Sequence, residues 1–305
     1  MQQFLLRRFI LTILTLLIVS VIVFAMARAA GDPRTLMLGD LHTQEQYDRL
    51  GEKLGLDKPY YQQYWVFLSG LLRGDFGKSI REHRPAGELI RERFLATLEL
   101  GVAGFLFSLV VGVPLGVLSA AKRGSIFDGI GKIVALIGQS APGFWIGIML
   151  IFFFAVMLGW VPASGREEWN SIVLPAITLG WFFMAANMRL VRSAMLDALD
   201  SEYIKLARAK GASSTSVIWK HALRNAVIPP LTFAGVSLGN MVAGSITTEM
   251  VFAWPGLGLL AIQSTLKADY PVLQGTVIIF TLLYIAVALL VDILYAYLDP
   301  RIRYA

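Results

Sequence analysis

The sequence predicts an all-α integral membrane protein with six transmembrane helices, and three observations support this fold class. Hydrophobic residues make up 56% of the 305 residues and only 16% are charged, whereas a soluble domain is about a quarter charged. Six stretches are predominantly apolar over the roughly 20 residues that a helix needs to span the hydrocarbon of a bilayer. Basic residues are concentrated in alternate segments between these stretches, which is typical of a chain that crosses a membrane repeatedly.

The predicted spans cover residues 9–27, 98–121, 133–158, 172–190, 227–252 and 272–295. Helices are expected, because an open strand would leave unpaired backbone groups in lipid. The first span follows Arg7 and Arg8 and so imitates a secretory signal. Its apolar run is longer than the roughly 7–15 residues of a signal core, and further spans follow it. We therefore expect an uncleaved first helix.

The distribution of Lys and Arg predicts the orientation of the helices. The N-terminal segment, the loops between spans 2 and 3 and between spans 4 and 5, and the C-terminal tail are basic. The two short loops on the opposite side contain only Arg166 and Lys267. Because cytoplasmic loops carry the excess of basic residues, we expect both termini in the cytoplasm and a long external loop between helices 1 and 2. The net charge of +6 then follows from topology, and no nucleic-acid partner is needed.

The chain is therefore expected to contain four parts. These are an N-terminal transmembrane helix (1–30), an external loop with short helices (31–97), a core of five transmembrane helices (98–296) and a cytoplasmic tail (297–305). Within the external loop, the apolar stretch 60–72 lies between turn signals and predicts a short helix on the outer face of the membrane domain.

Residues that could support catalysis, metal binding or nucleotide binding are scarce. The chain has no cysteine and only three histidines, far apart in sequence, so neither a metal site nor thiol chemistry is predicted. No series of Asp, Glu and His crosses the predicted spans, as a proton relay would require. The segment GDFGKS (74–79) imitates a phosphate-binding loop, but Leu72 stands where that loop needs glycine. The chain is thus not predicted to be an enzyme or to bind ATP. If it takes part in a process that consumes ATP, a partner must supply the energy.

Small residues recur at four-residue spacing in two spans, including Gly112 and Gly116 in span 2 and Gly235 and Gly239 in span 5. Such a stripe lets helices approach closely in lipid, either for packing within the subunit or to line a pathway or subunit interface. Glu249, near the outer end of span 5, would be costly in lipid. We expect it to face the dimer interface or the outer end of the pathway; the alternative is a hydrogen bond that fixes the end of span 5.

The loop between spans 4 and 5, residues 200–226, predicts two short basic helices. Asp200 or Ser201 can cap a helix that runs to Lys210, and Gly211 can end it in the left-handed conformation. A serine can then cap a second helix, which runs to the proline pair at the start of span 5. Two helices joined by a small-residue turn make a rigid element below the membrane. Composition alone leaves open whether this element lies on the membrane surface or docks on a protein.

This loop resembles the cytoplasmic EAA loop of binding-protein-dependent ABC permeases, which inserts a coupling helix into a cleft on the ATPase subunit. The shared features are Gly211 and the helix–turn–helix around it. The generic pattern has Glu-Ala-Ala before the glycine, whereas this chain has Lys205-Leu206-Ala207. The resemblance implies that the residues of ATPase coupling are Glu202, Tyr203, Lys205, Leu206, Ala207, Arg208, Ala209, Lys210, Gly211, His221, Arg224 and Asn225.

That departure is informative, because ARAKG followed by HALRNAVIP resembles the variant found in dipeptide, oligopeptide, glutathione and nickel permeases. Other segments agree with this subfamily, in order, along nearly the whole chain: GDP (31–33), LGLDKP (54–59), GDFGKS (74–79), RPAGELI (84–90), FAWPGLG (252–258), DYPVLQG (269–275) and LDPRIRY (298–304). The chain thus resembles the first permease of that family, which implies a type I ABC importer permease fold.

The resemblance implies a transport subunit of the bacterial inner membrane with no catalysis of its own. Its expected partners in the lipid bilayer and around it are a second homologous permease, two ATPase subunits that carry ATP and Mg, and an external solute-binding protein. The first choice of solute is a di- or oligopeptide; nickel, glutathione, opines or sugars are the alternatives. A self-sufficient secondary transporter or channel is a distant alternative, because it would need an ion site or inverted repeats around broken helices.

Overall fold

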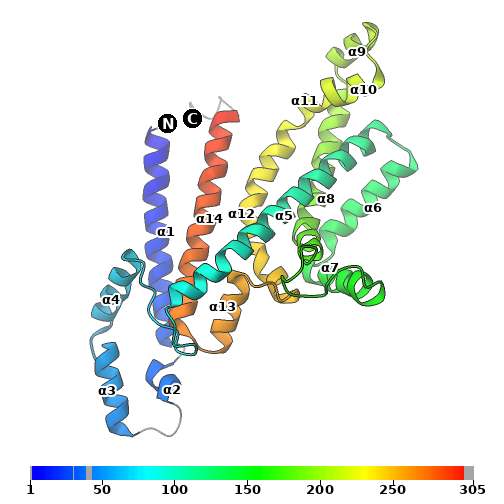
Figure 1. Cartoon of the computed structure of the whole chain (residues 1–305). Helices are drawn as coiled ribbons and strands as arrows, with labels where there is room; N and C mark the ends of the chain where they lie inside the picture. Colours follow the sequence, from blue (N-terminus) through cyan, green and yellow to red (C-terminus); the bar gives the residue numbers. More distant parts are fainter. Residues whose placement is uncertain (1, 30, 39–42, 299–305) are drawn as a thin grey trace. The chain divides into compact units, whose positions relative to one another are not determined.

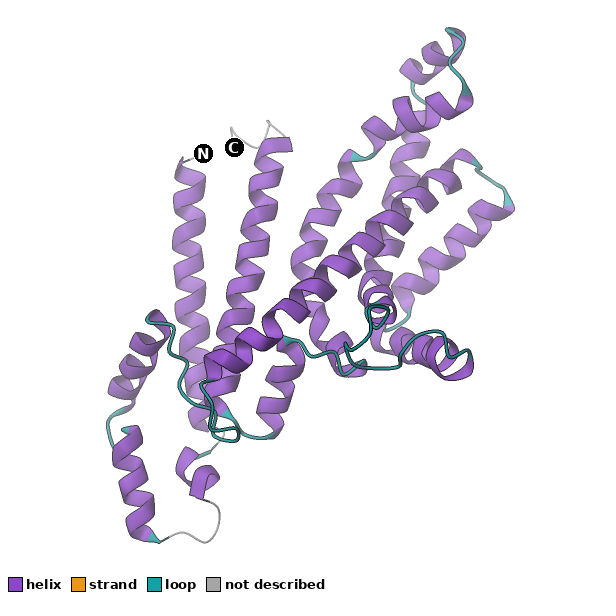
Figure 2. Cartoon of the chain, in the orientation of Figure 1, coloured by secondary structure: helices purple, strands orange, loops and turns teal. Residues whose placement is uncertain are grey.

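The computed structural model describes residues 2–29, 31–38 and 43–298, which form helices joined by loops (Figure 1, Figure 2). This described part contains no β-strand, only an isolated bridge between Lys78 and Pro85. The predicted cytoplasmic tail lies outside the described residues from position 299 onward. The chain divides into two compact units. The first comprises Met1–Ala96 and Pro255–Leu289, and the second comprises Thr97–Trp254 and Leu290–Ala305.

Several helices have the length and composition of membrane spans. Four are long and apolar enough to cross a membrane, namely Arg8–Ala29, Ala86–Ala121, Val173–Leu199 and Tyr270–Val291. Two bent helix pairs bring the number to six if each pair counts as one span: Ile126–Ser140 with Gly143–Met157, and Ser214–Ala226 with Ile228–Val251. Each predicted span therefore falls on apolar helix. The predicted span 133–158 contains the break of the first pair, and the predicted span 227–252 begins at the break of the second.

The first unit contains the N-terminal helix and the segment that follows it. Its elements are α1 (Gln2–Ala29), α2 (Pro33–Leu38), α3 (Gln44–Leu54), α4 (Tyr60–Leu72), the first turns of α5 (Ala86–Ala121), α13 (Leu257–Leu266) and most of α14 (Tyr270–Leu298). The predicted 60–72 helix is confirmed as α4, which begins after Pro59 and is followed by Gly74 with a φ of +75°. Proline fits a helix start, and glycine fits the left-handed turn that stops one.

Two features of this unit differ from the prediction. α5 begins at Ala86 rather than at residue 98, so it takes in the end of the predicted external loop. The reason is that Ala86, Leu89 and Ile90 repeat at helical spacing and are buried against α13 and α14. The second difference is α13 itself, which was not predicted because its 10 residues are too few for a membrane span.

A buried carboxylate fixes the 74–79 segment in this unit. Asp269 is 4% exposed, and its two oxygens accept hydrogen bonds from the Ser79 hydroxyl and from the Ile80 N–H, the latter at 3.1 Å. Arg81 Nε also donates to the Lys267 carbonyl at 2.8 Å. Two segments that resemble family motifs, GDFGKS and DYPVLQG, therefore meet in the fold. The hydroxyl of the serine in GKS thus donates to a carboxylate.

The second unit is built around α8. Its elements are the remainder of α5, α6 (Ile126–Ser140), α7 (Gly143–Leu150), the π-helix η1 (Ile151–Met157), α8 (Val173–Leu199), α9 (Glu202–Ala209), α10 (Ser214–Ser216), the π-helix η2 (Val217–Ala222), α11 (Leu223–Ala226) and α12 (Ile228–Val251). α6, α7, α11 and α12 all contact α8. More than half of the apolar window of α8 is buried, so α8 is the central helix of this unit.

The predicted span over residues 133–158 is not a single continuous helix. The structure breaks this span between Ser140 and Gly143, and the two pieces are bent by 113°. Pro142 stands at the break and occupies the N-cap of α7. It has no N–H to continue the hydrogen bonding of α6, and its ring disfavours a helical residue before it. Such a bend corresponds either to a broken span or to a re-entrant segment.

The glycine stripe of span 2 packs within the chain. A Cβ on Gly112 would lie 2.8 Å from the Met184 carbonyl oxygen of α8, and one on Gly116 would lie 2.6 Å from that of Met188. Both distances are too short for a methyl group, so these glycines allow α5 to cross close to α8. The prediction of tight packing within the subunit is confirmed for this pair. In α12, Gly235 is half-buried and Gly239 is buried.

Candidate functional site

The 200–226 loop begins where α8 ends. Ser201 occupies the N-cap position of α9, as predicted, but its hydroxyl donates to the Ala198 carbonyl instead of accepting from α9. Gly211 has a φ of +81°, which confirms the predicted left-handed end of this helix. Nothing lies within 4 Å of the position that a Cβ on Gly211 would take. Glycine is therefore needed here for its backbone conformation and not for space.

The second half of the loop is less regular than predicted. Ser213 is the capping serine, and its Oγ accepts from the Ser216 N–H at 3.3 Å. One α-helical turn, α10, then leads into the π-helix η2 and the short α11. Because a π-helix bonds residue i to i+5 and has a wider turn than an α-helix, it brings residues five apart closer to the same face. Val217 and Ala222 are five apart and both buried, so burial of this pair favours the wider turn that periodicity alone did not predict.

Buried apolar side chains attach the loop to the long helices. Ile204 of α9 is 0% exposed and Val217 of η2 is 1% exposed. Both belong to one hydrophobic cluster with Val117 of α5 and with Val191 and Met195 of α8. A displacement of the loop would expose these side chains to water, at a cost of roughly 25 cal/mol for each Å² of apolar surface. The loop is therefore fixed to α5 and α8 as one body.

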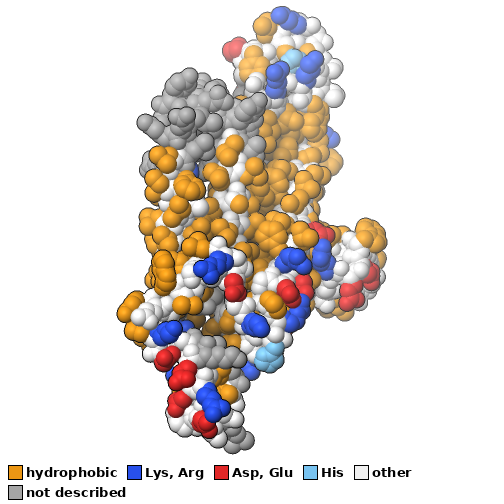
Figure 3. Space-filling model, turned by 60° about the vertical axis from the view of Figure 1, so that its left-hand side comes forward, with side chains coloured by type: hydrophobic (Ala, Val, Ile, Leu, Met, Phe, Trp, Pro, Cys, Tyr) orange, Lys and Arg blue, Asp and Glu red, His pale blue; other side chains and the backbone are white. Residues whose placement is uncertain are grey.

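Most of the predicted loop residues are on the surface. Glu202, Tyr203, Lys205, Leu206, Arg208, Ala209, Lys210, Gly211, Arg224 and Asn225 are exposed, and Ala207 and His221 are half-buried. Leu206 is 56% exposed and Trp219 is 45% exposed. Trp219 was not among the residues predicted from the sequence. An apolar residue within a basic helix was the available signal for Trp219. Lys and Arg side chains gather over the tip formed by α9 to α11 (Figure 3).

Glu249 lies inside the second unit. Its side chain is 0% exposed in the described chain. Thr97 of α5 donates from Oγ1 to Glu249 Oε1 at 2.8 Å. The alternative interpretation, a hydrogen bond that fixes the end of span 5, agrees with this geometry. An ion pair between Arg166 and Glu99, 2.6 Å long, secures the same end of α5 to the loop before α8.

A buried ion pair between α6 and α8 was also missed. Asp128 is 1% exposed, and Arg192 donates to its two oxygens from Nε at 2.7 Å and from Nη2 at 3.1 Å. Ser119 Oγ and Lys132 Nζ bind the same carboxylate at 2.7 and 3.1 Å. The sequence Ser125-x-x-Asp128 is a helix-capping signature, which was the signal available for Asp128. Nothing local in the sequence points to Arg192 as its partner.

Cationic side chains line a cavity of about 270 Å³ between α6 and α8. Lys132, Arg189 and Arg192 contribute their side chains, and Gln139 contributes an amide. Within the described chain, the Nε2 atom of Gln139 is buried and has no hydrogen-bond acceptor. Arg189 is exposed although it lies in a helix that is apolar enough to span a membrane. The cavity therefore offers positive charge and an amide donor to an anionic group.

Comparisons with known proteins identify the family of the chain. Residues 112–304 match the family model of the binding-protein-dependent transport system inner membrane component, and residues 1–101 match the N-terminal model of such components. Over all 305 residues the chain is 39% identical to the glutathione transport system permease protein GsiC of Escherichia coli K12, with 100% of both chains covered. It is 40% identical, with the same coverage, to the GsiC of Salmonella typhi.

Two solved structures share the fold of the chain. The inward-facing MetNI methionine ABC transporter superposes with a TM-score of 0.57 at 22% identity, covering 69% of this chain and 96% of that chain. An amino acid ABC transporter with histidines gives 0.51 at 17% identity, covering 70% and 94%. With the family match and the full-length relatives, they lead to one conclusion: the chain belongs to the binding-protein-dependent transport system inner membrane components, as a membrane-embedded permease subunit of an ABC importer and not an enzyme.

Proposed function

We propose that this chain is the first of two different permeases in an importer of short peptides, and that its 200–226 loop docks on the ATPase. The observation that carries the docking proposal is the contrast between the two faces of the loop. The inner face is buried against α5 and α8, and the outer face exposes apolar and basic side chains. A rigid base with an exposed, partly apolar tip suits an element that transmits motion from a partner.

The exposed side chains divide into two groups by their expected contribution. Tyr203, Leu206 and Trp219 are 42%, 56% and 45% exposed. Tyr and Trp are among the residue types that most often dominate the binding energy of protein interfaces, and burial of Leu206 would add apolar area. Arg208 and Arg224 are exposed cations that can meet acidic groups at the rim, where each contributes little. The first group is therefore the proposed anchor of the ATPase contact.

The proposed coupling is a two-state mechanism. ATP binding closes the two ATPase subunits, the docked loops move with them, and α5 and α8 follow because Ile204 and Val217 are packed against them. The membrane helices then alternate between outward- and inward-facing states. Nucleotide must favour one of these states over the other for this to be coupling. ATP and Mg act on the partner subunits, and this chain contributes no covalent chemistry.

The proposed orientation places the 200–226 loop and both termini in the cytoplasm of a bacterial cell, with the 31–85 segment outside. The chain has no cysteine, so single introduced cysteines can be labelled without background. A membrane-impermeant maleimide should label Gln44→Cys in intact cells and should label Ser214→Cys only after lysis, since both positions are exposed. The reverse pattern would contradict the orientation.

Short peptides, with glutathione first among them, are the proposed solutes. The full-length relatives are glutathione permeases, and all short peptides carry a carboxylate. Arg189 and Gln139, in the cavity between α6 and α8, offer donors to such a group. An arginine within an apolar span is costly unless it faces a partner, water or a solute. These observations support an anionic or zwitterionic solute better than a nickel ion.

Uptake by the reconstituted transporter tests this proposal. Vesicles would contain this chain, its partner permease and the ATPases, with the solute-binding protein outside, and labelled glutathione, dialanine and Ni²⁺ would be offered separately. We expect ATP-dependent, vanadate-sensitive uptake of glutathione or dialanine. Uptake of Ni²⁺ alone would contradict the proposed solute, and uptake that needs no ATPase would contradict the proposed coupling.

A further inference from the structure

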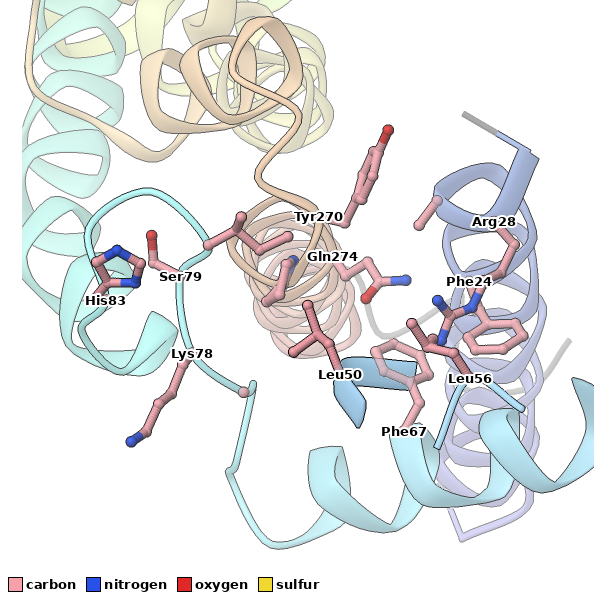
Figure 4. Close-up of a pocket in the computed structure, with 14 residues that line it drawn as sticks. Phe24, Arg28, Leu50, Leu56, Phe67, Lys78, Ser79, His83, Tyr270 and Gln274 are labelled. Atoms are coloured by element: carbon pink, nitrogen blue, oxygen red, sulfur yellow. The ribbon is translucent and has the colours of Figure 1, made fainter. Parts of the chain in front are cut away.

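The first unit contains a cavity of about 650 Å³ (Figure 4). It lies among the last turns of α1, the start of α14, the helices α3 and α4, and the 77–83 loop. Much of its wall is apolar, with Phe24 of α1, Leu56 and Phe67 close together on one side. Lys78 and His83 lie on the other side, on the loop. The cavity thus combines an apolar wall with basic side chains.

Arg28 is the cationic group on the apolar side of this cavity. Its guanidinium lies between Phe24, Leu56 and Phe67 in Figure 4, 5.3 Å from the centroid of the Phe24 ring. The residue is half-buried, and in the described part of the chain no hydrogen-bond acceptor or carboxylate binds it. A guanidinium has five N–H donors, and a half-buried one without acceptors is costly. An anionic ligand would supply those acceptors.

The depth of the cavity in the membrane follows from α1. Its apolar span, Arg8–Ala29, has 22 residues, and at 1.5 Å per residue it crosses roughly 33 Å, close to the roughly 30 Å of a bilayer's hydrocarbon. Arg28 therefore lies at the level of the lipid headgroups. Only 11% of the span is buried within the chain, so most of α1 is available to lipid or to a partner subunit.

α4 supports the same depth. The Ser20 and Tyr64 hydroxyls are 2.8 Å apart, and the Phe24 and Tyr64 rings are 5.5 Å apart. α4 thus lies beside the last turns of α1, at the level of one lipid leaflet. It also exposes Tyr60 and Trp65, at 70% and 67%, and such aromatic side chains are typical of the membrane–water interface. The cavity is therefore open to a region where phospholipids are the most abundant anions.

The charges around the cavity favour an anion with an apolar part. No Asp or Glu is among the described residues that line it. Asp32 interacts electrostatically with Arg28, but its oxygens already bind Arg34 and the Tyr47 hydroxyl. A small hydrophilic anion would gain nothing from the apolar wall, whereas a phospholipid satisfies both the cation and the wall.

We propose that this cavity binds an anionic phospholipid, with its phosphate on Arg28 and the start of an acyl chain against Phe24, Leu56 and Phe67. The rest of the acyl chains would lie along the lipid-facing surface of α1. The proposal rests on the orientation proposed above only in naming the leaflet as the outer one. Such a lipid would join α1 to α4 and α14 at the membrane surface.

Lipid retention by the purified whole transporter tests this proposal. The complex would be equilibrated in bilayers of phosphatidylethanolamine and phosphatidylglycerol, delipidated mildly, and analysed by native mass spectrometry for bound lipid. We expect phosphatidylglycerol to be retained in preference to phosphatidylethanolamine, and Arg28→Gln to weaken its binding by about tenfold, the effect of losing hydrogen bonds to a charged group. Arg73→Gln is the matched control: it removes an exposed cation from the end of α4, outside the cavity, and should change retention less than twofold.

A second variant separates binding from folding. Leu56→Trp fills the cavity and keeps every charge, so it should reduce retention as Arg28→Gln does, while circular dichroism and complex assembly stay normal. Equal retention in the wild type, Arg28→Gln and Leu56→Trp would overturn the proposal, as would equal retention of the two lipids. Displacement of phosphatidylglycerol by soluble glutathione or dialanine would also overturn it, because the site would then serve the transported solute. Each outcome is independent of whether the complex transports peptides.

Discussion

Two buried carboxylates, Asp269 of the first unit and Asp128 of the second, are held in different ways. Asp269 in the first unit is 4% exposed and accepts hydrogen bonds from neutral donors, the Ser79 hydroxyl and the Ile80 N–H. Asp128 in the second unit is 1% exposed, and both of its carboxylate oxygens accept hydrogen bonds from the guanidinium of Arg192. One carboxylate shapes a loop, and the other joins two long helices by charge.

The difference has an energetic consequence. A carboxylate held by neutral dipoles can be removed at the cost of its own hydrogen bonds. A carboxylate held by a half-buried cation cannot, because its loss leaves that cation unpaired. Arg192 follows Val191 and precedes Met195, which both pack beneath the 200–226 loop. The Asp128–Arg192 pair therefore lies where the proposed transmission of motion begins. Asp269, held by neutral donors, fixes the 74–79 segment of the first unit.

The largest effect is expected for Asp128→Ala. It leaves Arg192 partly buried without its partner, which should destabilise the fold by about 3–5 kcal/mol. The measurement is the thermal unfolding temperature of the purified transporter, together with its abundance in the membrane. The double variant Asp128→Asn with Arg192→Gln removes both charges and should recover much of the loss. If the double variant is as unstable as Asp128→Ala, the charge of Arg192 is not the cause.

A smaller effect is expected for Asp269→Ala. The Ser79 hydroxyl and the Ile80 N–H lose their acceptor, which should cost about 1–3 kcal/mol. Here no cation remains to be neutralised, so no second substitution should rescue the variant. Ser79→Ala, which removes one donor and leaves the carboxylate its other bonds, should cost about 1 kcal/mol by comparison. Thermal unfolding of both variants checks this order. A larger loss of stability for Ser79→Ala than for Asp269→Ala would contradict the interpretation that Asp269 is held by several neutral donors.

Local sequence patterns predicted the features of the fold that depend on local chemistry. Apolar length located four long helices and two bent helix pairs, and the flanking Pro59 and Gly74 located α4. The break at Pro142 was not predicted, because the apolar run continues through it and a proline can kink a span as well as break it. The 113° bend depends on how α6 and α7 each pack against α8, which hydropathy does not contain.

The same contrast holds in the candidate site, where local features were predicted and contacts between distant residues were not. The positive φ of Gly211 and the capping role of Ser213 followed from the residue types themselves. The partner of Asp128 lies 64 residues away, and Ser79 and Asp269 are 190 residues apart. Periodicity and capping rules describe neighbours within one helix, so they contain no information on such pairs. The hydrogen bond between Glu249 and Thr97 likewise joins two different helices.

A matched pair of glycine variants sharpens the comparison between the units. Gly211 and Gly74 both have positive φ, at +81° and +75°, and in both cases nothing lies within 4 Å of an added Cβ. Valine should therefore impose a similar backbone cost at each, about 1–2 kcal/mol. We expect Gly211→Val to remain in the membrane but to lose the ATPase stimulation caused by loaded binding protein.

Gly74→Val should keep that stimulation, because it strains the first unit and not the proposed docking loop. Membrane abundance of both variants must be measured with the ATPase activity, since a misfolded protein would lose both. Normal abundance of Gly211→Val with wild-type transport is incompatible with the docking role. Equal loss of stimulation in both variants would mean that backbone strain in either unit is enough to stop coupling.

The smallest effect is expected at Asp32, a surface counterpart of the two buried carboxylates. Hydrogen bonds from Arg34, and from the Tyr47 hydroxyl at 2.6 Å, hold the pKa of Asp32 well below its ordinary value. A carboxyl group whose pKa is lower in the folded than in the unfolded chain stabilises the fold above the unfolded pKa, which is about 3.9 for Asp. That contribution is lost as the pH falls from there through the lower folded pKa.

Hydrogen exchange in α3 should therefore be unchanged between pH 7 and 5, after correction for the intrinsic rate, and should accelerate below about pH 4. Asp32→Asn should remove this acceleration while leaving α9 unaffected, because the amide cannot titrate. An acceleration that persists in Asp32→Asn would assign the pH dependence to another group.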